Sequence, residues 1–151
     1  MKRFDLVYAD PAWSYDKKVG QGVADEQYKT MSLEELKCLP IKELSKDNSV
    51  LLLWATFPML KEALELVECW GFMYKTAGFV WTKLNKSGTP FFGIGHYTKS
   101  NAEVCLLCVR GKGLKVMSNR VSSVVLSVRG KHSSKPHDIY SRIEELYGGG
   151  D

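Results

Sequence analysis

Residues 4–13, with the sequence FDLVYADPAW, indicate the fold more clearly than any other segment. Their apolar run ends abruptly in an acid, a proline and a large aromatic residue, which predicts a buried strand that delivers a carboxylate and a flat ring to the rim of a sheet. Open α/β sheets bind ligands at the carboxyl ends of their strands, so Asp10 becomes a candidate site residue. Pro11 has no N–H to donate, so the strand should end there and leave nearby carbonyls free as acceptors. An ordinary Asp-Pro turn fits these residues equally well.

Strands and helices alternate along the rest of the chain. Apolar runs predict strands at 48–56, 72–83, 102–109 and 121–128, and helical spacing with capping residues predicts helices at 32–39, 58–70 and 136–147, with one more helical turn at 41–44. Residues 14–27 and 85–100 are predicted loops. This succession predicts one α/β domain over residues 1–151 with a mostly parallel sheet, whose later strands form an antiparallel edge.

Composition and charge narrow the class of protein. At 151 residues the chain is long enough to bury a core. It has no apolar run of membrane-span length and no signal-peptide pattern, so we expect an intracellular protein with no membrane partner. The net charge of +4 is a weak indication of an anionic partner. Cys105 and Cys108 spell C-x-x-C, but within a strand their thiols point to opposite faces, which argues against a metal or redox site.

The sequence offers little for several other kinds of chemistry. His96, His132 and His137 are poorly spaced to activate a serine or cysteine nucleophile, and solvated loops explain them better. FGIG at 92–95 lacks the third glycine and the strand-to-helix turn of a phosphate-binding loop. Basic residues cluster in the second half of the chain, which fits either a solvated face or a surface for a phosphate backbone. They are Lys83, Lys86, Lys99, Arg110, Lys112, Lys115, Arg120, Arg129, Lys131 and Lys135.

The end of the first predicted strand suits the activation of an exocyclic amine. The amine of a purine is a poor nucleophile because its lone pair is delocalised into the ring. A carboxylate at Asp10 and the carbonyl of Pro11 would accept its hydrogens and draw the nitrogen towards a tetrahedral, attacking form, while Trp13 would stack on the base. This chemistry needs neither a metal nor a covalent intermediate.

The tetrapeptide at 10–13 resembles the catalytic tetrapeptide of the adenine-N6 methyltransferases related to the messenger-RNA adenosine methyltransferase, a family with many bacterial and phage members. The resemblance continues, in the family's order and spacing, over nearly the whole chain. It is carried by YKTMS (28–32), LLLWAT (51–56), WGF (70–72), VWTK (80–83), NAE (101–103), VRG (109–111) and HSSKP (132–136). It implies a Rossmann-like fold that uses S-adenosylmethionine.

The resemblance also implies a role for each matching residue. Asp10 and Pro11 would accept hydrogen bonds from the adenine amine and border the cofactor, and Trp13 would line or stack in the base pocket. The family usually has a second proline where this chain has Ala12. Because that change leaves the carbonyl of Pro11 in place, we expect activity to tolerate it.

Four matching residues lie outside the tetrapeptide. Tyr28 would lie over the substrate adenosine, and Lys83 and Glu103 match positions near the substrate. Lys135 matches a lysine that approaches the methionine part of the cofactor. These positions come from four separate segments of the chain.

The family continues past its last helix into a further strand and a short turn that grip the ribose and adenine of the cofactor. This chain ends at Asp151, so we expect an incomplete cofactor pocket and an apolar unpaired edge at residues 4–10. The hypothesis is a nucleic-acid adenine-N6 methyltransferase, DNA favoured over RNA, with a related subunit as a candidate partner in a homo- or heterodimer. The alternatives are a catalytically silent or truncated relative that binds nucleic acid or a homologous subunit, and an unrelated Rossmann-like binding domain.

Overall fold

The computed structural model describes residues 2–13, 30–93, 95–130 and 134–148. The predicted loop at 14–27, Tyr28 and His132 therefore lie outside the described residues. The elements, in chain order, are β1 (Phe4–Ala9), α2 (Leu33–Lys37), α3 (Ile41–Leu44), β2 (Ser45–Ala55), a 3₁₀ turn η1 (Phe57–Met59), α4 (Leu60–Cys69), β3 (Met73–Leu84), β4 (Ala102–Arg110), β5 (Val124–Val128) and α5 (Asp138–Tyr147). Every helix and strand predicted within the described residues is present. Among these residues, no helix is long and apolar enough to cross a membrane.

The described strands form one mixed sheet in the order β1-β2-β4-β3-β5. β1 pairs with β2 and β3 pairs with β5 in parallel, whereas β4 is antiparallel to both of its neighbours. Four strands therefore point the same way, which confirms the α/β class. The prediction of an antiparallel edge is wrong, because the reversed strand lies in the middle of the sheet. The chain returns from β3 to β4 through residues 85–101, whose described part contains no helix, and such direct returns join antiparallel strands.

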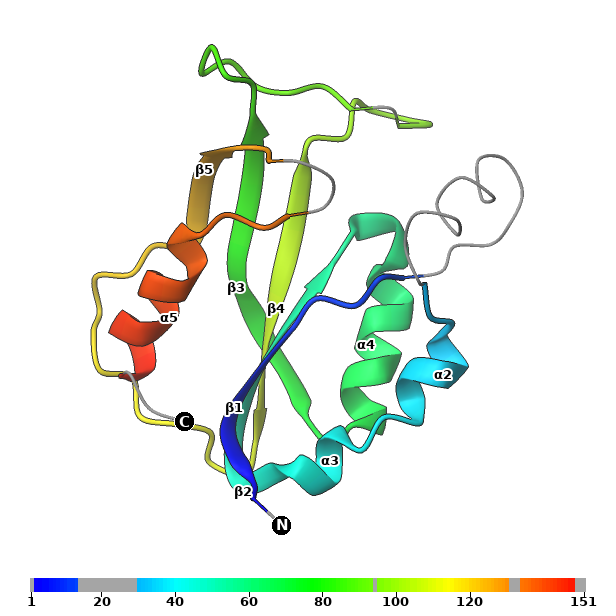
Figure 1. Cartoon of the computed structure of the whole chain (residues 1–151), viewed down its shortest axis with the longest axis vertical. Helices are drawn as coiled ribbons and strands as arrows, with labels where there is room; N and C mark the ends of the chain where they lie inside the picture. The colour runs from blue at the N-terminus through cyan, green and yellow to red at the C-terminus, as the bar shows by residue number, and fades with distance from the viewer. Residues whose placement is uncertain (1, 14–29, 94, 131–133, 149–151) are drawn as a thin grey trace.

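Helices cover both faces of the sheet (Figure 1). On one face, Leu36 of α2 and Leu66 of α4 pack in a cluster with Leu51 and Leu53 of β2. On the other face, Ile139 of α5 belongs to a second cluster that contains alternate residues of β2, namely Val50, Leu52 and Trp54. Alternation along β2 thus fills both cores, as its continuous apolar run predicts. Each fully buried leucine contributes about 1.5–3 kcal/mol to this packing.

Local signals explain where the elements begin. Ser32 Oγ accepts a hydrogen bond from Glu35 N at 3.2 Å, and Glu35 Oε1 accepts one from Ser32 N at 2.9 Å, which is the capping box expected for α2. β5 is shorter than predicted, because its pairing with β3 begins only at Val124, which lies opposite Val80 in the register.

Candidate active site

The topology gathers the candidate residues at one end of the sheet. Asp10 directly follows β1, and Lys83 lies one residue before the end of β3. Because β4 runs in the opposite direction, its beginning lies at the same end, where Glu103 pairs with Trp81 of β3 in the register. Lys135 comes from the segment between β5 and α5. The central reversed strand therefore contributes a side chain to this site.

Four charged side chains form a chain of ion pairs across this end of the sheet. Lys83 Nζ lies 2.7 Å from Glu103 Oε2, Glu103 Oε1 lies 3.3 Å from Lys135 Nζ, and Lys135 Nζ lies 3.2 Å from Asp10 Oδ1. The side chains of Lys135 and Glu103 are only 9% and 11% exposed, while that of Asp10 is 40% exposed. The chain of charges thus runs from a buried pair to a carboxylate at the rim.

The surroundings of Asp10 shift its proton affinity. Partial burial raises its pKa above the ordinary value of 3.8, and the carboxylate of Glu103 raises it further. The ammonium of Lys135 acts in the opposite direction. The net shift is upwards, which makes Asp10 a better hydrogen-bond and proton acceptor than a solvated aspartate.

Each of the two lysines lies over the ring of a tryptophan. Lys135 Nζ lies 5.5 Å from the ring centroid of Trp54, and Lys83 Nζ lies 5.3 Å from that of Trp81. The two rings meet edge to face at 6.4 Å. Trp54 Nε1 also donates to Tyr8 Oη at 2.7 Å. Sequence reasoning missed these supporting residues, although each tryptophan stands two residues before the end of its predicted strand.

The segment after Asp10 corrects one expectation. Pro11 O accepts from Trp13 N at 3.0 Å, and Ala12 O accepts from Met31 N at 2.9 Å, so these carbonyls are not free as predicted. A carbonyl oxygen has two lone pairs, and Pro11 O retains one for a further donor. These backbone hydrogen bonds form because the chain changes direction directly after β1.

The position of Trp13 differs from that of an open stacking ring. The residue is 8% exposed and belongs to the core cluster on the α4 face. Its Nε1 donates to the backbone oxygen of Trp54 at 3.3 Å. In this position the side chain anchors the segment, and stacking on a base would require the ring to leave the core.

Other sequence features lie apart from the ion-pair chain. His137 is exposed near the ring of Tyr140, with 6.3 Å between the centroids, and His96 is exposed in the loop after β3. Cys105 and Cys108 lie in the clusters on opposite faces of the sheet, as predicted. Neither pair of residues adds a nucleophile or a base to the site.

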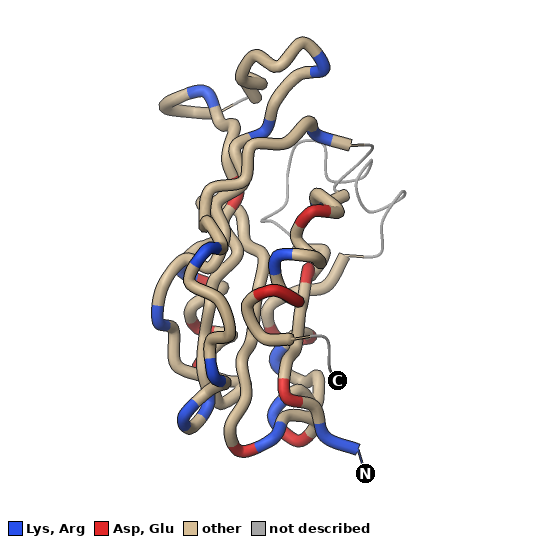
Figure 2. The backbone as a smooth tube through the Cα atoms, turned by 90° about the vertical axis from the view of Figure 1, so that its left-hand side faces the viewer, with Lys and Arg blue, Asp and Glu red and all other residues tan. Residues whose placement is uncertain are grey.

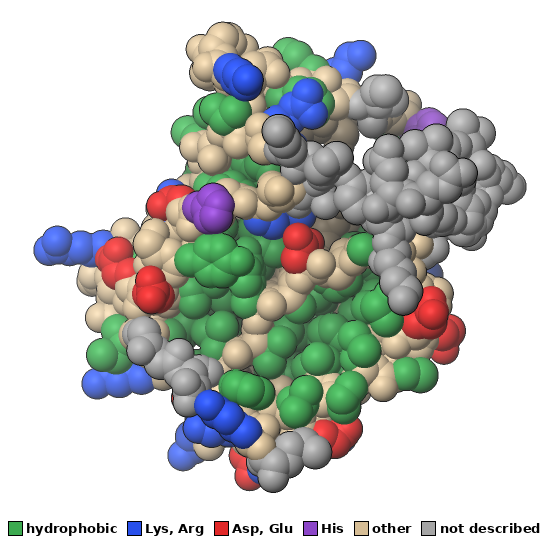
Figure 3. Space-filling view, viewed as in Figure 1, with side chains coloured by type: hydrophobic (Ala, Val, Ile, Leu, Met, Phe, Trp, Pro, Cys, Tyr) green, Lys and Arg blue, Asp and Glu red, His purple; other side chains and the backbone are tan. Residues whose placement is uncertain are grey.

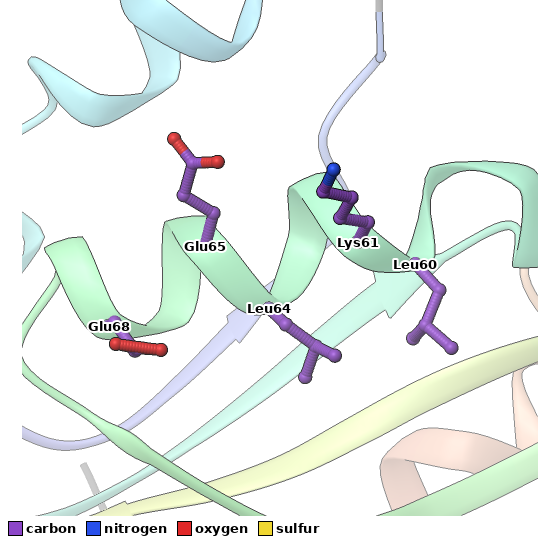
Figure 4. Close-up of a pocket in the computed structure, with 5 residues that line it drawn as sticks. All are labelled: Leu60, Lys61, Leu64, Glu65 and Glu68. Atoms are coloured by element: carbon purple, nitrogen blue, oxygen red, sulfur yellow. The ribbon is translucent and has the colours of Figure 1, made fainter.

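Two depressions on the surface are distinct from the ion-pair chain. One, on α4, is lined by Leu60, Lys61, Leu64, Glu65 and Glu68, all from a single helix (Figure 4). The other is a groove of about 570 Å³ beside β1, lined by apolar residues of β1 and α5 such as Leu6 and Ile143 and also by the charged Asp5, Lys115 and Glu144. Hydrophobic side chains are visible in the hollow between α5 and β1 (Figure 3). Among the described strands β1 pairs only with β2, so this groove runs along an edge of the sheet.

The fold and the site together define a Rossmann-like α/β domain with a charged acceptor at the carboxyl end of its first strand. The MT-A70 family model matches residues 4–150, and the chain therefore belongs to the MT-A70 family of S-adenosylmethionine-dependent methyltransferases.

Individual relatives agree with the family. The chain is 30% identical to the type II methyltransferase M.MunI of Mycoplasma over 97% of its own length and 68% of the relative's. It is 27% identical to the human N(6)-adenosine-methyltransferase catalytic subunit METTL3 and 26% identical to the MT-A70-like protein of Drosophila melanogaster, in each case over 95% of its length. It spans only 24% and 22% of those two relatives.

Proposed function

We propose that this protein transfers a methyl group from S-adenosylmethionine to the N6 amine of adenine in a nucleic acid. The observation that carries the proposal is the carboxylate of Asp10, which stands at the rim of the sheet with Lys135 Nζ 3.2 Å from its Oδ1. An acceptor at a strand end, with a raised pKa, suits the binding and deprotonation of an amine. Membership of the MT-A70 family supports the reaction type.

Asp10 and Pro11 act on the amine in this proposal. Asp10 Oδ and the remaining lone pair of Pro11 O accept the two amine hydrogens, which turns the nitrogen lone pair out of the ring plane. As the nitrogen gains the methyl group, Asp10 accepts one of its protons. Trp13 holds the segment in place from the core, and Lys83 and Glu103 border the substrate.

The charges of the site fit the methionine part of the cofactor. The ammonium of Lys135 and the carboxylate of Asp10 lie side by side and complement the carboxylate and ammonium of an amino acid. Together with Pro11 they would hold this part of the molecule. When bound, S-adenosylmethionine supplies an electrophilic methyl group on a sulfonium.

The substrate is an adenine that is single-stranded or extruded from a duplex, since the amine of a stacked base cannot reach a site at the rim of a sheet. DNA is favoured over RNA, because the identity to the type II methyltransferase is 30%, against 26–27% for the N(6)-adenosine-methyltransferases. Tyr28 is assigned to the adenosine on the resemblance alone. A related subunit is a candidate partner, in a homo- or heterodimer.

The proposal is tested by incubating the protein with methyl-labelled S-adenosylmethionine and adenine-containing DNA or RNA. Asp10→Ala should lower transfer by about 10²-fold or more. Asp47→Ala, which removes the same charge from the opposite end of the sheet, should leave transfer unchanged. Transfer that persists in Asp10→Ala would refute the mechanism. Binding of nucleic acid without transfer would support the alternative of a catalytically silent relative.

A further inference from the structure

A groove opens between the ends of β3 and β5, next to the site. Its lining consists of Leu84, Asn85, Lys86, Val128, Arg129 and Gly130, and its volume is about 550 Å³. Leu84 pairs with Val128 at the last register position of the two parallel strands, and Arg129 N donates to Leu84 O at 3.2 Å. The groove therefore begins one residue beyond Lys83, a distance of about 3.3 Å along a strand.

The arginine of this groove is held in a defined position. The guanidinium carbon of Arg129 lies 3.8 Å from the ring centroid of Phe91. Phe91 is fixed in turn, because its N–H donates to Lys83 O at 2.9 Å. A guanidinium that packs on the face of an aromatic ring keeps the N–H groups at its edge available for a ligand. Arg129 is therefore oriented before any ligand binds.

The turn that carries Lys86 is also ordered by hydrogen bonds. Asn85 N donates to Thr89 O at 2.8 Å, and Gly88 N donates to Asn85 O at 2.9 Å. Asn85 Nδ2 donates to Pro90 O at 3.2 Å. Both backbone and side-chain bonds thus fix the residue before Lys86, and so the wall of the groove.

The charge in this region is uncompensated. Residues 84–137 contain nine lysines and arginines and a single acid, Glu103, which is engaged by Lys83 and Lys135. Within the described part of the chain, neither Lys86 nor Arg129 forms an ion pair. The described loops at this end of the molecule carry lysines and arginines but no aspartate or glutamate (Figure 2). An oriented guanidinium and a lysine on an ordered turn, neither in an ion pair among the described residues, define a site for an anion.

We infer that this groove binds the backbone phosphate adjacent to the target adenine, an inference that rests on the proposed function. An adenine beside Lys83 and Glu103 brings its flanking phosphodiester to the end of β3, where Lys86 and Arg129 line the groove. Arginine binds phosphate through two parallel hydrogen bonds, and lysine binds it as a point charge. The apolar side chains of Leu84 and Val128 provide a surface for the sugar between base and phosphate.

The test measures binding of a short single-stranded DNA with one central adenine, by fluorescence anisotropy and without cofactor. Uncharged methylphosphonate linkages are introduced one at a time along the strand. For the wild-type protein, a methylphosphonate at a linkage flanking the adenine should weaken binding by about tenfold. The double variant Lys86→Gln/Arg129→Gln should bind the unmodified strand about as weakly and lose sensitivity to that linkage. Its slope of log K against log [salt] should fall by roughly 1.4.

Two further variants serve as controls. Lys112→Gln/Arg120→Gln removes the same charge outside the groove and should remain sensitive to the methylphosphonate. Lys86→Gln alone removes no contact on which the turn depends, and should reproduce about half of the change in salt slope. The inference is overturned if the groove variant binds like wild type, or stays equally sensitive to the modified linkage. It is overturned as well if the wild-type protein does not bind the strand.

Methyl transfer measured on the same proteins separates the two proposals. If transfer depends on Asp10 while groove variants bind and react normally, only the phosphate site is wrong. If strands bind through the groove but no transfer occurs, the proposed function fails and the phosphate site stands.

Discussion

Ion pairs occupy both ends of the sheet, but their surroundings differ. At the amino end, Arg3 and Arg110 approach Asp47 at 3.1 and 4.0 Å, and the Asp47 side chain is 82% exposed. At the carboxyl end, Glu103 and Lys135 are about one-tenth exposed and bridge Lys83 to Asp10. Exposed pairs contribute about 0–1 kcal/mol, and buried ones must offset a large desolvation cost. The buried chain of charges is therefore a poor source of stability, since apolar residues fill a buried site at lower cost, and its main effect under the proposed function is on the charge of Asp10.

Replacing the buried acid should give the largest effect on the fold. Glu103→Gln keeps the shape of the side chain but removes the partner of two lysines, of which Lys135 is almost fully buried. We expect a loss of about 2–3 kcal/mol in the free energy of unfolding, or a fall in Tm of roughly 5–10 °C. Thermal or urea unfolding measures it.

The matched change at the other end is Asp47→Asn, which also removes one carboxylate with two cationic neighbours. It should cost less than about 0.5 kcal/mol. Equal losses for the two variants would contradict the contrast between a buried and an exposed cluster.

Removing the buried lysine should change the pH dependence of transfer. In the proposed mechanism transfer requires ionised Asp10, so the acid limb of kcat/KM should follow the pKa of Asp10, which burial raises above 3.8. Lys135 lowers this pKa, and Lys135→Gln should therefore move the acid limb to higher pH. Glu103 raises the pKa, and Glu103→Gln should move the limb to lower pH. A pH–rate profile for each variant measures the shift.

The control is Lys46→Gln at the amino end, where Lys46 Nζ lies 3.0 Å from Asp5 Oδ1. This variant should leave the acid limb in place. Shifts of the same sign in Lys135→Gln and Glu103→Gln would show that the two changes do not act through the charge of Asp10.

The sequence predicts the elements of this fold better than their arrangement. Apolar periodicity and caps place all the described helices and strands, and the acid-proline end of residues 4–13 puts Asp10 directly after β1, as predicted. The apolar run of β4, however, carries no information on strand direction, so the sequence does not predict its reversed and central position. The contact of Asp10 with Lys135 joins residues 125 positions apart and depends on that arrangement. The acid and proline before Trp13 predict a ring at an open rim, whereas its indole donates to the backbone oxygen of Trp54 in the core.

The same comparison between the two ends of the sheet can be made with two buried tryptophans, Trp54 and Trp70. Trp54→Phe removes the donor to Tyr8 Oη and weakens the contact with Lys135. We expect a loss of about 1–2 kcal/mol in stability and a several-fold loss of kcat for folded protein. Trp70 lies after α4 and donates to Leu36 O at 3.0 Å, so Trp70→Phe should lose similar stability without changing kcat. A fall in kcat for both variants would assign the effect to the fold alone.

The smallest effect is expected where the chain differs from the usual tetrapeptide. Ala12→Pro restores the second proline next to Asp10 and leaves the carbonyl of Pro11 in place. The N–H of Ala12 donates to no described residue, whereas its carbonyl, which proline retains, accepts from Met31 N at 2.9 Å. We therefore expect kcat/KM within about twofold of wild type and a change in stability below about 1 kcal/mol. A large loss of transfer with an unchanged Tm would mean that Ala12 itself must move or donate during the reaction, and that the buried charges do not hold this segment rigidly.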